Sequence, residues 1–164
     1  MITIKPHHFL DVIKLYGKGI ERFVPDEKYN HDFYSVANKI MDNHQVLICV
    51  TLYDDHICGP CRYLDNGVCV DKIYHIEGIS LKDEWNKVLD KRIMEYTNVS
   101  ENDKYTAHEF CKLLYSIKEH IFDIWKEEND TAKKSRYDDF CTGVKKFLGY
   151  SDKEPPEGME TYFF

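Results

Sequence analysis

The sequence lacks an excess of basic residues, a long apolar run and any internal repeat. Its 29 acidic residues outnumber 22 basic ones, for a formal net charge of −7, whereas proteins that bind nucleic-acid backbones or anionic membranes need clustered Lys and Arg. The longest apolar run, Val46 to Val50, is far too short to cross a bilayer. We therefore expect neither nucleic acid nor a membrane as the main partner.

Targeting and organic-cofactor signals are also absent. The first residues lack the basic start and apolar stretch of a secretion signal, which predicts a cytoplasmic protein. There is no G-x-G-x-x-G motif and no phosphate-binding loop, so nothing indicates a bound nucleotide. One group of basic residues is interpreted as a solvated helix face; it comprises Lys133, Lys134, Arg136, Lys145 and Lys146.

The remaining patterns predict one α+β domain over residues 1–164, mostly helical, with a small N-terminal sheet and a cysteine-bearing metal loop. Alternation at Ile2 to Lys5 and the β-branched run at Val46 to Val50 predict two strands that pair with each other. Helices are expected from Pro6 to the glycines at 17 and 19, from Tyr29 to Asn43, from Ser80 to about Tyr96, from Thr106 towards Glu128, and from Thr131 to Leu148.

Helix ends can also be assigned from the sequence. Ser80 is the expected cap of one helix, and Thr106 with Glu109 has the spacing of a capping box. The tail from Pro155 to Gly158 is predicted to be non-helical.

Three of the six cysteines fall between positions 58 and 69, in an irregular segment from Tyr53 to Asp71. Cys58 and Cys61 form a C-x-x-C pair around Gly-Pro, which favours a tight turn that aims both sulfurs at one point. The Asn-Gly turn signal before Cys69 can return a third sulfur to the first two. Three converging thiolates need a cation, so the crowding predicts a metal site. Cys111 and Cys141, at apolar helical positions, are expected to pack as small hydrophobes.

Two other interpretations of the cysteines are weaker. Free cysteines that are merely close in sequence would seldom show this spacing. A thioredoxin-like redox pair requires a helix after Cys-Gly-Pro-Cys, but Asp65-Asn66-Gly67 interrupts that segment. Three sulfurs leave one ligand position open. Zinc could complete it with His75, as C-x2-C-x7-C-x5-H, and a [4Fe–4S] cluster would take its fourth ligand from elsewhere.

Two segments of the N-terminal half carry a family resemblance. The first is Lys5-Pro6-His7-His8-Phe9-Leu10 followed by Tyr16-Gly17-Lys18-Gly19; the second runs from Asp54-Asp55-His56-Ile57 through Cys58 and Cys61 to Cys69. Over about residues 2–95 the chain resembles the DUF1284 family of small iron–sulfur-binding proteins of unknown function. The resemblance implies a cluster-binding half at 1–95, whereas the helical half at 96–164 resembles nothing we can assign.

The chain departs from that family at one informative position. Where the family has cysteine directly after His-His-Leu-Leu, this sequence has Asp11. If that cysteine is the family's fourth ligand, Asp11 takes its place with a harder, weaker carboxylate. Cys49 is the main rival for the fourth position, followed by His7 and His8. Asp54 and Asp55 are expected to bond backbone amides of the loop.

These observations leave three hypotheses for function. The first is a [4Fe–4S] protein that transfers electrons or senses redox state or a ligand, with a redox protein partner or a small molecule at the cluster. The second is an enzyme with an open iron site at Asp11, where His7 or His8 moves a proton. The third is a structural zinc module for protein interaction.

Overall fold

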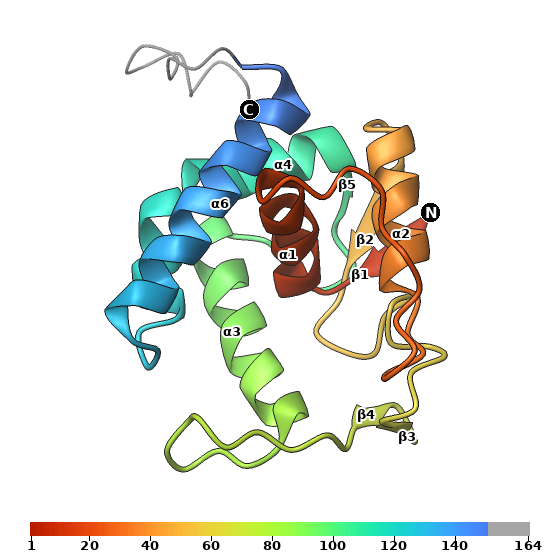
Figure 1. Cartoon of the computed structure of the whole chain (residues 1–164), viewed down its shortest axis with the longest axis vertical. Coiled ribbons are helices and arrows are strands. Elements are labelled where there is room, and N and C mark those ends of the chain that lie inside the picture. Colours follow the sequence, from red (N-terminus) through yellow and green to blue (C-terminus); the bar gives the residue numbers. More distant parts are fainter. Residues whose placement is uncertain (151–164) are drawn as a thin grey trace.

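The computed structural model describes residues 1–150, and its strands form two small sheets (Figure 1). The first sheet has the order β1-β2-β5, with β1 at Ile2–Ile4, β2 at Leu47–Val50 and β5 at Lys104–Thr106. Strand β1 runs parallel to β2, and β5 is antiparallel to β2. The second sheet is a hairpin of β3 at Leu64–Asp65 and β4 at Val68–Cys69. The predicted pairing of the first two strands is confirmed.

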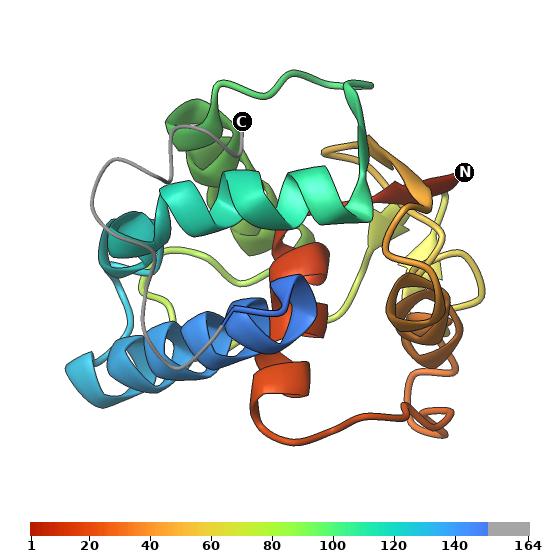
Figure 2. The ribbon, with the colours of Figure 1, turned by 90° about the horizontal axis from the view of Figure 1, so that it is seen from above.

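Helices make up most of the rest of the described chain, so the predicted α+β class is confirmed. They are α1 at Pro6–Gly17, α2 at Phe33–Asp42, α3 at Lys82–Thr97, α4 at Ala107–Ser116, the 3-10 helix η1 at Lys118–His120, α5 at Ile121–Ile124 and α6 at Asp130–Leu148. Helix α1 contacts α3, α4 and α6, and Figure 2 shows it between α4 and α6. None of the helices described is long and apolar enough to span a bilayer.

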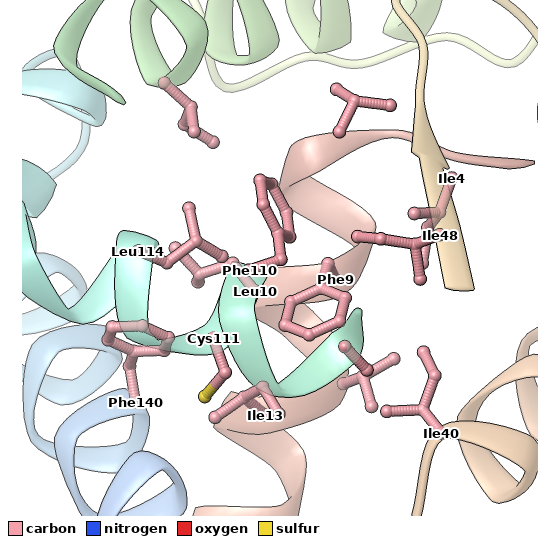
Figure 3. Close-up of a cluster of buried hydrophobic side chains, with 14 of the residues drawn as sticks. Ile4, Phe9, Leu10, Ile13, Ile40, Ile48, Phe110, Cys111, Leu114 and Phe140 are labelled. Atoms are coloured by element: carbon pink, nitrogen blue, oxygen red, sulfur yellow. The ribbon is translucent and has the colours of Figure 1, made fainter. Parts of the chain in front are cut away.

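Helix α1 supplies the centre of the hydrophobic core (Figure 3). Phe9, Leu10 and Ile13 are fully buried, at the spacing that places them on one side of a helix. The ring of Phe9 lies 5.0 Å from that of Phe110 in an edge-to-face arrangement, which is favourable for aromatic pairs. Burial of this side leaves the other side of the first turns of α1 available for polar residues.

Two glycines let α1 and α6 approach unusually closely. A Cβ atom added at Gly143 would lie 1.9 Å from the carbonyl oxygen of Ile13, and one added at Gly17 would lie 1.8 Å from that of Asp139. No side chain fits at such distances, so the two backbones are in direct contact. This crossing fixes the position of α1 against the C-terminal helices.

Two predicted helix starts are wrong. The helix expected from Tyr29 begins only at Phe33, because Asp26 accepts bonds from the N–H groups of residues 28 and 29 and Asn30 adopts a φ of 55°. Ser80 does not cap α3, which begins at Lys82 after Leu81. The backbone around Ser80 is instead held extended, since its carbonyl oxygen accepts from the N–H of residue 73 at 2.9 Å.

The capping box of Thr106 and Glu109 is confirmed, but the long helix predicted after it is wrong. Helix α4 ends at Ser116, whose hydroxyl donates to the carbonyl oxygen of Leu113 at 2.6 Å. Such back-bonding bends helices, and the next residue, Ile117, leaves helical geometry with φ −108° and ψ 19°. The predicted tail at Pro155 to Gly158 lies outside the described residues.

Candidate metal centre

The cysteine loop folds as its turn residues predict. The N–H of Cys61 donates to the carbonyl oxygen of Cys58 at 2.9 Å, which closes the C-x-x-C turn. Asn66 and Gly67 adopt φ values of 50° and 79°, the left-handed pair that a tight hairpin turn requires. The resulting β3–β4 hairpin pairs residue 64 with Cys69, so the third sulfur returns towards the first two.

One cavity of about 360 Å³ lies between this loop, α1, α3 and α6, and we call it the cysteine cavity. Nearly all the residues predicted as ligands line it: Cys58, Cys61, Cys69, Asp11, His7, His8 and His75. Cys49 does not, because it lies in β2, 6% exposed and opposite Thr3 of β1. The structure therefore brings together the cysteine loop and the first turns of α1, and leaves Cys49 outside.

The spacing of the sulfurs bears on what they can bind. Four ligands of one tetrahedral zinc ion lie about 3.8 Å apart, given a Zn–S distance of about 2.3 Å. Within residues 1–150, only His8, Asp55 and Cys58 place three potential ligand atoms within 4.8 Å of one another. The three cysteines and His75 do not form such a group. Cys69 is nonetheless close enough to Cys61 for the two to interact electrostatically.

Asp55 ties the cysteine loop to α1. This carboxylate is 4% exposed and accepts from the backbone N–H groups of Ile57 and Cys58, each at 3.1 Å. It also accepts from the N–H of Lys5 at 2.8 Å and contacts Nδ1 of His8 at 2.7 Å. Although burial opposes ionisation, His8 and these N–H donors hold the pKa of Asp55 well below its usual range. The expected bonding to loop amides is confirmed for Asp55 but not for Asp54, which is exposed and forms no such bond within residues 1–150. The contact of Asp55 with His8 was not predicted.

A second buried carboxylate holds His7. Both oxygens of Asp90, in α3, lie 2.9 Å from Nδ1 of His7, and the backbone N–H of His7 donates to one of them at 2.7 Å. Asp90 is fully buried. Its role was not predicted from the sequence, although an aspartate next to Leu89 on the apolar side of a helix is a signal that could have indicated it.

The two histidines therefore form adjacent imidazole–carboxylate pairs, with ring centroids 4.3 Å apart. Because each Nδ1 contacts a carboxylate, Nε2 is the ring nitrogen left to act as a ligand or base. Burial lowers the pKa of His8 despite Asp55. Burial also opposes protonation of His7, but Asp90 outweighs it and the pKa of His7 is raised. Carboxylates that hold the other ring nitrogen in this way are common around metal-binding histidines.

Asp11 and His75 occupy more exposed parts of the cavity wall. Asp11 lies one turn after His7 and forms an ion pair with Lys14 at 3.2 Å. His75 is exposed, and its ring lies 6.4 Å from that of Trp85. Because the side chain of Asp11 is 31% exposed, its carboxylate can exchange Lys14 for a metal at little cost in free energy.

The interpretation of the basic residues near the C-terminus as a solvated face is wrong for Lys133, whose side chain is 15% exposed, and for Arg136. The side chain of Arg136 is 16% exposed, lies 4.2 Å over the ring of Trp125 and pairs with Glu128. All three residues line the end of the cysteine cavity formed by α6 and the segment that precedes it. Stacking on the aromatic ring explains the burial, since a guanidinium packs well on an indole face. The expectation for Cys111 is confirmed, because it lies in the hydrophobic core. Cys141 is buried too, but its side chain forms a hydrogen bond with Tyr137.

The thiols of Cys58 and Cys69 are poor nucleophiles in this structure. Burial and the charge of Asp55 raise the pKa of Cys58 to about 12, and burial also raises the pKa of Cys69. A thioredoxin-like thiol needs the opposite shift. These shifts therefore argue against a thioredoxin-like redox pair at this site.

Comparison of the chain with models of known families, with curated proteins and with solved structures finds no match. The resemblance to the DUF1284 family stays a prediction from the sequence.

Proposed function

We propose that the protein binds a [4Fe–4S] cluster through Cys58, Cys61 and Cys69 and uses it to transfer electrons or to sense redox state or a ligand. The observation that carries the proposal is the cysteine cavity itself, which three thiols share with His7 and His8. Soft thiolates are the usual ligands of iron–sulfur clusters. The donor set and the size of the cavity fit such a group.

The three thiols support a cluster over a single zinc ion. The cysteine ligands of a [4Fe–4S] cluster bind different irons and need not approach one another as closely as the ligands of one ion. The three cysteines line one cavity, and among the described residues they and His75 form no group of ligand atoms within 4.8 Å of one another. For the three cysteines and His75 to bind one zinc ion, the cysteine loop and residue 75 would have to move towards each other.

The fourth iron would lie next to the first turns of α1. His7, His8 and Asp11 all line the cavity there, and one of them is the proposed fourth ligand. The resemblance points to Asp11, whereas the geometry points to His8, because Asp55 orients its ring and Cys58 is nearby. A ligand other than cysteine would leave this iron more exchangeable than the other three.

All three cysteines are half-buried rather than deep in the core. A cluster near the surface is suited to electron exchange with a redox partner. The paired histidines favour a second candidate, an enzyme whose exchangeable iron binds substrate while an imidazole moves a proton. Binding of a small probe such as cyanide to the cluster, seen as a spectral change that Asp11→Cys abolishes, would favour this candidate.

Cysteine variants test the proposal. The protein is reconstituted without oxygen using iron and sulfide, and cluster content is measured for the wild type and for Cys58→Ser, Cys61→Ser and Cys69→Ser. Each variant should lose most of the bound iron and sulfide, whereas Cys141→Ser, outside the cavity, should retain them. If all three loop variants bind as much iron and sulfide as the control, the proposal is wrong.

A further inference from the structure

Lys5 is a buried cation beside the proposed cluster. Lys5 is 3% exposed, and its Nζ atom lies 3.8 Å from the sulfur of Cys58. Within the described part of the chain, that sulfur is the one hydrogen-bond acceptor near the ammonium group. A lysine this buried without a strong partner is rare, because the charge loses its hydration.

The carboxylates near Lys5 are already committed to other donors. Asp55 binds three backbone N–H groups and His8, and Asp90 binds the ring and the backbone of His7. They favour the lysine charge through space, but no hydrogen bond joins either of them to Nζ. The sulfur of Cys58 is therefore the acceptor that the geometry offers to this ammonium group.

We infer that Lys5 is a positioning residue that tunes the potential of the proposed cluster. Its ammonium donates an N–H···S bond to the metal-bound sulfur of Cys58 and offsets the negative charge of the centre. Reduction adds one more negative charge, so a fixed positive charge a few ångströms away stabilises the reduced form more than the oxidised form. Hydrogen bonds to cluster sulfurs and local charge are established determinants of cluster potential. The inference rests on the proposed function.

The test measures the midpoint potential of the reconstituted protein by mediated titration with dithionite as the electron donor. Lys5→Gln keeps N–H donors but removes the charge, and Lys5→Arg keeps the charge. Lys39→Met removes an exposed lysine of α2, outside the cysteine cavity, and serves as the control. We expect the potential of Lys5→Gln to be clearly more negative than that of Lys5→Arg, with the control unchanged.

Other outcomes distinguish a failure of the role of Lys5 from a failure of the proposed function. Equal potentials for the wild type, Lys5→Gln and Lys5→Arg would overturn the role of Lys5 and leave the proposed function standing. If the wild type takes up no iron and sulfide, the proposed function fails and the inference fails with it. If Lys5→Gln takes up no cluster, cluster uptake by Lys5→Met and Lys5→Arg is compared instead. Uptake by Lys5→Met alone overturns the inference, whereas uptake by Lys5→Arg alone supports it.

Discussion

Nδ1 of His8 lies 2.7 Å from a carboxylate oxygen of Asp55, although 47 positions separate the two residues in the sequence. This contact joins the first turn of α1 to the start of the cysteine loop. Asp55 also organises the loop itself through the N–H groups of Ile57 and Cys58. One buried carboxylate therefore sets the orientation of an imidazole and the position of a proposed cysteine ligand.

Asp55→Asn should destabilise the protein by about 3 kcal/mol, because it leaves donors that surround a buried carboxylate without a charged acceptor. Urea unfolding of the metal-free protein measures the effect. Asp54→Asn is the matched control, since Asp54 is exposed, and it should change stability by no more than about 0.5 kcal/mol. Equal effects of the two substitutions would show that Asp55 does not organise the loop.

The pair of His7 and Asp90 predicts a pH dependence. Because the pKa of His7 is raised in the folded state, the pair stabilises the fold fully at pH values below the unfolded-state pKa of about 6.5. This stabilisation is lost as the pH rises through the folded-state pKa of His7. The stability difference between the metal-free wild type and Asp90→Asn should therefore be larger at pH 6 than at pH 9. Urea unfolding at both pH values checks this. A difference that grows with pH would contradict protonation of His7 in the folded protein.

Gly143→Ala should destabilise the fold by about 3 kcal/mol, since the added Cβ would overlap the backbone of α1 and force the helices apart. Gly59→Ala is the control, because its nearest atom to a new Cβ is 3.8 Å away. Thermal unfolding of the metal-free variants compares them. A stable Gly143→Ala would mean that the α1–α6 crossing is not fixed as the structure has it.

Asp11→Cys should make the proposed cluster more durable. A thiolate at this position would give the fourth iron the soft ligand that the other three have. We expect loss of the visible absorption under air, or with an iron chelator, to be slower than in the wild type by on the order of tenfold. Asp11→Asn, which cannot supply a thiolate, is the control. If Asp11→Cys loses its cluster as fast as the wild type, Asp11 does not lie at the fourth iron, and His8 becomes the candidate to test.

Local sequence signals predicted the parts of the fold that depend on neighbouring residues. Pro6 at the start of α1, the Asn66-Gly67 turn and the capping box at Thr106 all act within a few positions, so they can be recognised without the rest of the chain. The C-x-x-C turn belongs to the same group. The cysteine loop was therefore the best-predicted part of the site.

Long-range partners could not be predicted in this way. Asp90 lies 83 positions from His7, and nothing near either residue specifies the other. Strand β5 has three residues and is defined mainly by its pairing with β2. The break after Ser116 depends on a side-chain bond within an otherwise helical pattern. These features arise from packing of the whole chain, which outweighs local preferences.

The most direct test of the account is to measure iron, zinc and acid-labile sulfide, together with the visible spectrum, in protein purified without oxygen. The account predicts a brown protein with broad absorption near 400 nm and about four irons and four sulfides per chain. A colourless protein with about one zinc and no sulfide would contradict it and make the centre a structural zinc site.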